Sequence, residues 1–127
     1  MQKEIIRSAQ VSTPGAPFSP AVTFGDLVFV SGQPGFDKNR QLDKGNFAAQ
    51  MRQAMINVQT LLEAAGSSWD KALKVTVVIT KTEFFAEMNE IYQEFFSSRE
   101  TYPARITMVA GFGNPDFLVE IECIAHR

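Results

Sequence analysis

The stretch TYPARITMVAGFGNPDFLVEIECIAHR, residues 101–127, contains two runs of alternating side-chain character, separated by the turn-rich segment AGFGNPD. Alternation with a period of two is typical of β-strands, whose successive side chains point to opposite faces of a sheet. We therefore predict strands at about 105–109 and 117–125. The first run contains Arg105 and the second contains Glu120. Charge inside such runs marks a face that is left to solvent or reserved for chemistry.

The same alternation predicts the two faces of each strand. In the second run we expect one apolar set to face the helices: Val119, Ile121, Cys123 and Ala125. In the first run we expect Ile106 and Met108 to pack under the helices. Arg105 would then project from the open face together with Glu120, as its neighbour if the two strands pair.

Earlier segments supply the rest of a sheet and two helices. KEIIR (3–7) alternates, and AVTFGDLVFVSG (21–32) reads as two strands joined by a hairpin at Gly25-Asp26. From residue 47 apolar residues recur at spacings of three and four, which predicts a helix of about five turns. Asn46 is its expected N-cap and Gly66 its C-terminal stop.

KVTVVIT (74–80) is rich in β-branched residues and predicts a further strand. Residues 80–83 can form a capping box for a second helix, because a threonine stands three residues before a glutamate. That helix would carry an apolar stripe between Phe84 and Phe95, and Pro103 ends any continuation.

The resulting order β-β-β-α-β-α-β-β predicts an α+β fold in one domain, 1–127, with about six strands in a mixed sheet and both helices on one face. The other face would be bare. It mixes Val109, Leu118 and Ile124 with charge, which is too apolar for simple solvation. A homo-oligomer that buries this face, with the site between subunits, resolves the conflict.

Composition excludes several classes of function. The 127 residues are 45% hydrophobic with a formal net charge of −2 and no Lys/Arg cluster, so nucleic acid is not an expected partner. The charged N-terminus and the lack of a run near the ~18 apolar residues of a span predict a soluble, cytoplasmic protein with no membrane partner. The single cysteine, Cys123, and the lack of paired His/Cys spacings argue against a disulfide or a metal.

Several pieces of the chain resemble the RidA (YjgF/YER057c/UK114) family of enamine/imine deaminases. They are APFSPAV, FVSGQ, AAQMRQAMINVQTLLEAAG, MNEIYQEFF and, most specifically, YPARITMVAGF followed by LVEIECIA. The resemblance covers nearly the whole chain. It implies a chorismate-mutase-like fold and a homotrimer whose sheets form a central barrel. It also implies hydrolysis of 2-imino or enamino acids, such as 2-iminopropanoate from 2-aminoacrylate, to 2-keto acids and ammonia. No metal or organic cofactor is implied.

The resemblance also assigns roles to individual residues. Arg105 would bind the substrate carboxylate and Glu120 would orient the attacking water. The remaining substrate contacts would be Phe18, Ser31, Gly32, Asn89 and the backbone N–H of Thr107. A guanidinium can hold a carboxylate with two charge-assisted bonds, and a carboxylate can act as general base toward water. A buried Glu120 would have a raised pKa, provided that it does not pair tightly with Arg105.

The chain departs from the family pattern at three positions. Phe18 stands where many members have a tyrosine, so it can shape the pocket but cannot exchange a proton. Ile106 and Thr107 stand where a small residue and often a cysteine are found, so cysteine chemistry is not available there. The backbone N–H of Thr107 survives any side-chain change. These departures favour a divergent subgroup with a different imino or enamino acid.

Other readings of these residues stay open. Arg105 could be a structural residue that ties subunits together through an ion pair with Glu120 or Glu122. Asn89 could simply bond to a loop, Cys123 reads as a core residue, and His126 lies close to the C-terminus.

At the level of function, a trimer that binds 2-keto acids without turnover is the alternative to the deaminase. An endoribonuclease is the weaker alternative, because the charge balance is acidic and there is no histidine pair.

Overall fold

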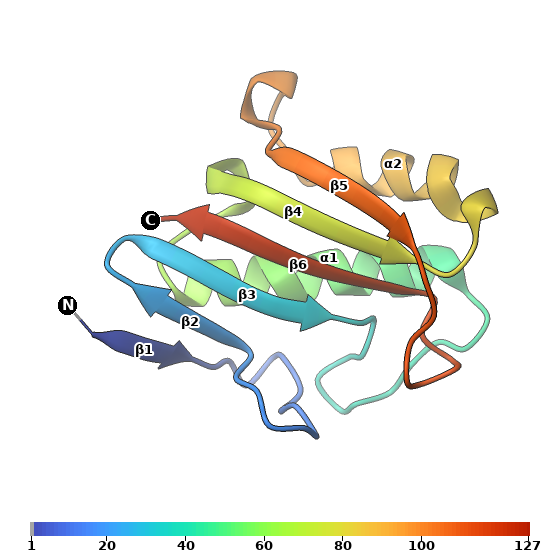
Figure 1. The fold of residues 1–127 in the computed structure, drawn as a ribbon, viewed down its shortest axis with the longest axis horizontal. Helices are drawn as coiled ribbons and strands as arrows, with labels where there is room; N and C mark the ends of the chain where they lie inside the picture. The colour runs from blue at the N-terminus through green and yellow to red at the C-terminus, as the bar shows by residue number, and fades with distance from the viewer. Residues whose placement is uncertain (1) are drawn as a thin grey trace.

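A computed structural model describes residues 2–127 and has the predicted order β-β-β-α-β-α-β-β (Figure 1). The strands are β1 (Lys3–Ile6), β2 (Ala21–Phe24), β3 (Leu27–Gln33), β4 (Ala72–Ile79), β5 (Ala104–Val109) and β6 (Val119–His126). The helices are α1 (Phe47–Ala64) and α2 (Phe85–Gln93), and short 3-10 turns are η1 (Trp69–Lys71), η2 (Thr82–Phe84) and η3 (Arg99–Thr101). The predicted elements are confirmed, with β6 beginning two residues later than expected.

All six strands form one mixed sheet in the order β1-β2-β3-β6-β4-β5. The last strand of the chain, β6, is inserted between β3 and β4 and runs antiparallel to both, whereas β5 pairs with β4 in parallel and forms an edge. The β2–β3 hairpin turns at Gly25, whose φ of 60° is a conformation that glycine adopts at little cost. The predicted hairpin is confirmed.

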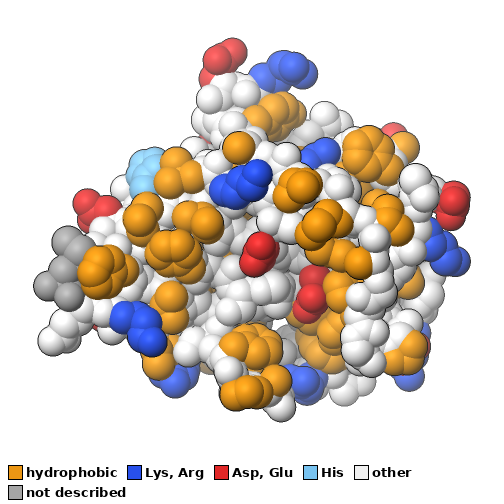
Figure 2. Space-filling view, in the orientation of Figure 1, with side chains coloured by type: hydrophobic (Ala, Val, Ile, Leu, Met, Phe, Trp, Pro, Cys, Tyr) orange, Lys and Arg blue, Asp and Glu red, His pale blue; other side chains and the backbone are white. Residues whose placement is uncertain are grey.

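Both helices cover one face of the sheet, and the hydrophobic core lies between the two layers (Figure 1). The core includes the predicted inward set of β6, Val119, Ile121, Cys123 and Ala125, all at most 1% exposed. The opposite face is open. Exposed apolar side chains lie along it, namely Ile5, Phe24, Leu27, Phe29, Ile106 and Met108. Figure 2 shows this face, with hydrophobic side chains spread across it and acidic groups near its middle.

Helix α1 begins and ends where its sequence predicts. The side-chain oxygen of Asn46 accepts a hydrogen bond from the backbone N–H of Ala49 at 3.1 Å, which satisfies one of the free donors of the first turn. At the other end the chain leaves the helix through Gly66, with a φ of 84°. The apolar stripe between these ends is buried against β3 and β6.

The predicted capping box at residues 80–83 is wrong. Thr80 has a buried Oγ1 with no hydrogen-bond partner among residues 2–127, and η2 occupies the positions where the helix was expected to begin. Helix α2 starts at Phe85 without a side-chain cap. Its stripe is nevertheless buried as expected, through Met88, Ile91 and Tyr92. Packing of this stripe therefore fixes the helix without help from a cap.

The structure also reverses the predicted faces of β5. Arg105 is in register with Val75 of β4, and Thr107 with Val77. Both valines are fully buried on the helix side of the sheet. Paired residues on adjacent strands point to the same face, so Arg105 projects toward the helices.

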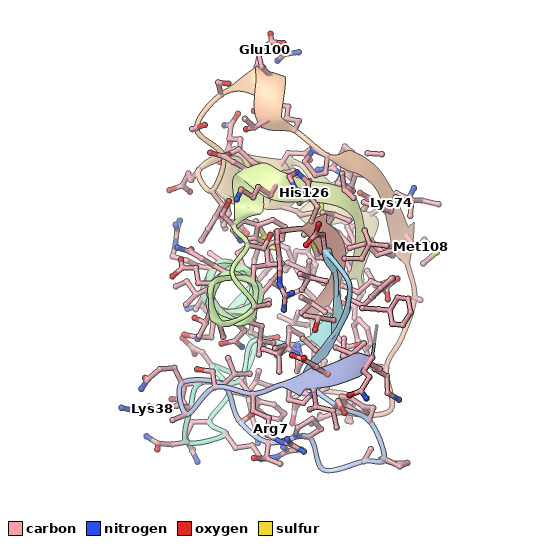
Figure 3. All side chains as sticks on the ribbon, turned by 90° about the vertical axis from the view of Figure 1, so that its left-hand side faces the viewer. Arg7, Lys38, Lys74, Glu100, Met108 and His126 are labelled. Atoms are coloured by element: carbon pink, nitrogen blue, oxygen red, sulfur yellow. The ribbon has the colours of Figure 1, made fainter. Side chains whose placement is uncertain are left out.

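Ile106 and Met108 accordingly project from the open face, where they are 47% and 44% exposed. Figure 3 shows Met108 and Lys74 on the side of the sheet opposite α1. Alternation determines which residues share a side, but not which side meets the helices. On this edge strand the helix side is only partly covered, so it tolerates an arginine.

Residues 2–127 contain neither a candidate membrane span nor a candidate metal-binding cluster. None of the helices in this part of the chain is long and apolar enough to cross a membrane. The same residues contain no group of three or more His, Cys, Asp or Glu side chains placed to hold a metal ion.

Candidate functional site

Arg105 lines a cavity of about 320 Å³ between β5 and α2, which we call the Arg105 cavity. Its walls include Asn89, Tyr92 and Gln93 of α2, Arg99 and Tyr102 of the segment that leads into β5, and Arg105 itself. Ion pairs within residues 2–127 are limited to Lys44–Asp116 and Arg52–Glu94. The Arg105 guanidinium therefore has no carboxylate within 4 Å in this part of the chain and is free to bind an anion.

Tyr92 supports the guanidinium of Arg105. The Cζ atom of Arg105 lies 4.8 Å from the centre of the Tyr92 ring, which is within the range of a cation–π contact. Burial raises the pKa of Tyr92 to about 12, although the charge of Arg105 opposes the rise. The phenol therefore stays neutral and holds Arg105 through its ring without neutralising its charge.

Two other predicted residues lie on the same side of the sheet. Asn89 is half-buried and forms part of the cavity wall. Thr107 points to the helix side beside Arg105, and its buried Oγ1 has no hydrogen-bond partner among residues 2–127. The structure thus brings Arg105, Asn89 and Thr107 to the helix side of the β5 edge.

Glu120 projects from the other face of the sheet, because it is in register with Val78 between the buried Val77 and Ile79 of β4. It lines a second cavity of about 340 Å³, the Glu120 cavity. Its walls include Phe18, Gly32, Phe36, Arg40 and Phe117. The prediction that Arg105 and Glu120 are neighbours on one face is wrong, since β4 separates their strands and their side chains point to opposite faces.

The surroundings of Glu120 favour its protonated form. Burial raises the pKa of Glu120, and the like charge of Glu122, two residues along the same face, raises it further. Gly32 lies directly against this carboxyl group, since a Cβ atom there would be 3.6 Å from Oε1 and Oε2. Glu120 is thus a half-buried carboxyl group with a raised pKa that faces a cavity, which suits a general base.

Phe18 and Ser31 act on the Glu120 cavity in different ways. Phe18 is 52% exposed and forms part of its wall. Ser31 donates its hydroxyl hydrogen bond to the carbonyl of Ser19 at 2.6 Å, and its N–H bonds to Pro20. Ser31 therefore holds the loop that carries Phe18.

Two buried amides of α1 hold the other walls of the Glu120 cavity. Gln50 accepts a hydrogen bond from the N–H of Leu118 at 2.9 Å and donates to the carbonyl of Asp116 at 3.1 Å. Asn57 donates to the carbonyls of Pro34 and Phe36, at 3.1 and 2.8 Å. Buried amides with satisfied bonds fix the loops to which they bind. The loops on either side of Glu120 are therefore anchored to one helix.

Sequence reasoning missed several residues of the two cavities. Tyr92 was expected only as part of an apolar stripe, although its spacing of three from Asn89 places both on one helix face. For Arg99, the only feature of the sequence that indicated a place in the cavity was its position six residues before Arg105. Arg40 has a φ of 59°, donates to the carbonyl of Thr13 at 2.8 Å and lies 4.8 Å over the Phe36 ring. A positive φ at an arginine could not be read from the sequence.

The remaining candidates lie outside the cavities. Cys123 is buried on the helix side, and burial raises the pKa of its thiol to about 12, as expected of a core residue. Glu122 is exposed on the open face, and His126 is exposed at the end of β6.

Comparison with known proteins agrees with the fold. The sequence model of the Endoribonuclease L-PSP family matches residues 9–127. A RutC family protein of Pyrococcus horikoshii is 38% identical over 126 residues, 98% of each chain. The crystal structure of RidA from an Antarctic Psychrobacter has a TM-score of 0.89 at 33% identity, covering 98% of this chain and 99% of that one.

Escherichia coli TdcF, solved with bound serine, has a TM-score of 0.89 at 34% identity over 98% of both chains. These relatives exceed 30% identity over nearly their whole length, and the family model spans almost all of this sequence. The chain therefore belongs to the endoribonuclease L-PSP family, which includes the RidA, YjgF and RutC proteins.

Proposed function

We propose that this protein hydrolyses 2-imino acids, and the enamino acids that equilibrate with them, to 2-keto acids and ammonia. The observation that carries the proposal is the guanidinium of Arg105 in its cavity, which has no carboxylate within 4 Å among residues 2–127. A 2-imino acid has a carboxylate next to an electrophilic C=N carbon. Two charge-assisted hydrogen bonds from Arg105 to that carboxylate would fix the carbon for attack.

Glu120 would supply the proton transfers. Its carboxylate takes a proton from water while the water oxygen forms a bond to the imine carbon, giving a tetrahedral carbinolamine. Glu120 returns this proton to the nitrogen, which completes the amino group of the carbinolamine. Glu120 then takes the proton of the new hydroxyl group and passes it to the amino nitrogen, so that the C–N bond breaks with its electron pair leaving on ammonia and the C–O bond becomes the carbonyl of the keto acid. The raised pKa of Glu120 supports this role, because it brings the carboxyl group closer to the basicity that the step requires.

The complete site would lie between copies of the chain. Arg105 and Glu120 project from opposite faces of one sheet, so a single copy cannot present both to one small substrate. The exposed apolar side chains of the open face support burial of that face in an oligomer. We propose a homotrimer with a central barrel of three sheets, in which Arg105 of one copy meets Glu120 of the next.

The test uses imino acid generated in situ by an amino-acid oxidase, with imine loss and keto acid followed together. Arg105→Gln should lower kcat/KM by roughly a hundredfold or more, because two charge-assisted hydrogen bonds are lost. Glu120→Gln should lower kcat by roughly 10²–10⁴-fold. A variant that keeps full activity and the wild-type oligomeric state would exclude the role proposed for that residue.

Mixing the two inactive variants tests whether the site is shared. In trimers that combine Arg105→Gln and Glu120→Gln chains, one interface has both intact halves. Co-refolding equal amounts should therefore restore about a quarter of the wild-type activity, given random assembly with cyclic symmetry. A co-refolded mixture that contains mixed trimers but stays inactive would contradict a site shared between copies.

A second candidate is a trimer that binds small carboxylic acids without turnover. Phe18, which lacks a phenol, favours it, and so does the bound serine in the TdcF structure. This candidate predicts Arg105-dependent binding of 2-keto acids with no acceleration of imine loss.

Ribonuclease activity, which the family description names, is a less well supported proposal. A chain with a net charge of −2 is a poor match for the negatively charged backbone of RNA. Intact RNA after incubation at low salt would dismiss it.

A further inference from the structure

The Arg105 cavity contains a second arginine. Arg99 lies in η3, six residues before Arg105, and both side chains line the same space of about 320 Å³. Within residues 2–127, Arg99 also has no carboxylate within 4 Å, since the ion pairs of this part of the chain are Lys44–Asp116 and Arg52–Glu94. Two arginines thus line one small cavity with no carboxylate within 4 Å of either among residues 2–127, an arrangement suited to a ligand with two anionic groups.

Each of these two guanidinium groups lies within cation–π distance of a tyrosine ring. The Cζ atom of Arg99 lies 5.9 Å from the ring centre of Tyr102, as Arg105 lies 4.8 Å from that of Tyr92. Tyr102 is itself held edge-to-face against Phe96, with ring centres 5.5 Å apart. A guanidinium that stacks on a ring keeps its N–H edge free to bind a carboxylate with two bonds.

The backbone around Arg99 is fixed by hydrogen bonds, although its side chain is exposed. Asp70 accepts from the N–H of Ser97 at 3.0 Å and from the hydroxyl of Thr101 at 2.8 Å, and these bonds lower its pKa. Ser98 accepts from the N–H of Glu100 at 3.2 Å. Glu100 marks the outer end of this segment, which projects beyond the β5 edge of the sheet (Figures 1 and 3). Arg99 is thus presented by an ordered turn.

We propose that Arg99 is a specificity-determining residue that selects acids with a second carboxylate. This inference rests on the role of Arg105 under the proposed function. A four- or five-carbon 2-imino dicarboxylate, or the matching 2-keto acid, places one carboxylate on Arg105 and the other on Arg99. Such a dianion compensates both cations, whereas a monocarboxylate leaves Arg99 without a partner.

The test measures binding, so that it does not depend on turnover. Titration calorimetry at low salt compares oxaloacetate and 2-oxoglutarate with 2-oxobutanoate. The wild-type protein should bind one of the dicarboxylates about tenfold more tightly than the monocarboxylate, which corresponds to about 1.4 kcal/mol. Arg99→Gln should abolish this preference, because it should weaken binding of the dicarboxylate far more than binding of 2-oxobutanoate. Arg99→Lys, which keeps the charge but not the planar fork, should retain part of the preference.

Arg7→Gln is the matched control. It makes the same change of charge at an exposed arginine just after β1, at the opposite edge of the sheet from β5, and should leave both affinities unchanged. Arg105→Gln should weaken both classes of acid. Equal binding of the two classes by wild type, or a parallel loss of both in Arg99→Gln at the wild-type oligomeric mass, would overturn the role of Arg99 even if imines are hydrolysed. If wild type binds neither class and hydrolyses no imine, the proposed function itself fails.

Discussion

The guanidinium of Arg105 has no acidic neighbour within 4 Å among residues 2–127, and the pKa of Glu120 is raised, because the two side chains lie in different surroundings. Arg105 lies over the Tyr92 ring and has no acid within 4 Å among residues 2–127. Glu120 has a carboxylate neighbour, Glu122, and no cation among the groups that shift its pKa. An ion pair between the two would have lowered the pKa of Glu120 and occupied the guanidinium. Their placement on opposite faces prevents this pairing within one copy, as the proposed function requires.

The like charge of Glu122 leads to a prediction of pH dependence. Activity should fall on acidification, as Glu120 becomes protonated and can no longer act as a base. Glu122→Gln removes a charge that raises the pKa of Glu120. The carboxyl group should then ionise at lower pH, and the acid limb of kcat/KM against pH should move to lower pH. Glu4→Gln, the same change on the far edge strand β1, should leave the limb in place. A limb that moves to higher pH in Glu122→Gln would contradict the assignment of Glu120 as the base.

Among the elements, α1 does most to shape the Glu120 cavity. Its apolar stripe packs on the sheet, while Gln50 and Asn57 bind the loops on the two sides of Glu120. The loop that contains Gly35 lies very close to α1, since a Cβ atom at Gly35 would come within 2.7 Å of the Gln50 backbone. An alanine there would force the loop away from the helix. The helix therefore couples the stability of the fold to the geometry of the cavity.

The N-cap of α1 gives a prediction at this scale. Asn46→Ala removes the acceptor for the N–H of Ala49 and should lower the free energy of unfolding by about 1 kcal/mol. Urea unfolding at a fixed protein concentration measures the change, because assembly makes stability depend on concentration. Asn39→Ala is the control, since Asn39 is exposed and its side chain makes no hydrogen bond within residues 2–127. Equal stability of the two variants would show that the cap contributes nothing.

For the molecule as a whole, the open face of the sheet is the feature that one copy cannot explain. The helices cover most of one face and leave only its edges partly exposed, while the other face displays apolar side chains along β1, β2, β3 and β5 (Figure 2). Exposed apolar surface of this kind is unfavourable in water and marks an interaction surface. In the trimer that we propose, the other two copies would cover this face and would bring the Arg105 cavity of one copy to the Glu120 cavity of the next.

Ile106→Asp tests this assembly. A charge at this position of the open face should prevent association in the proposed interface, because an unpaired buried carboxylate is strongly unfavourable. The variant should elute at the mass of one 14.1 kDa chain and lose imine hydrolysis, with its helical content unchanged. Ile56→Asp is the control, since Ile56 is 40% exposed on α1 and lies away from the open face. A wild-type protein that is itself monomeric would refute the shared site.

Most helices and strands of this chain could be predicted from the sequence, because hydrophobic periodicity and capping depend on residues only a few positions apart. The α+β order, the hairpin at Gly25, both ends of α1 and the inward set of β6 are all visible in the sequence for that reason. The capping box at 80–83 failed, because the requirement to pack Met88 and Tyr92 outweighed a preference of the backbone.

The tertiary structure decided what local rules leave open. Alternation pairs Arg105 with Thr107 and separates both from Ile106, but the register of β5 against β4 chooses which pair faces the helices. The insertion of β6 between β3 and β4 separates Arg105 from Glu120. Two strands that follow each other in sequence need not pair, because the sheet order is set by contacts between distant segments. Most residues of the candidate site could therefore be identified in the sequence. Their division between two cavities on opposite faces of the sheet depended on long-range strand pairing.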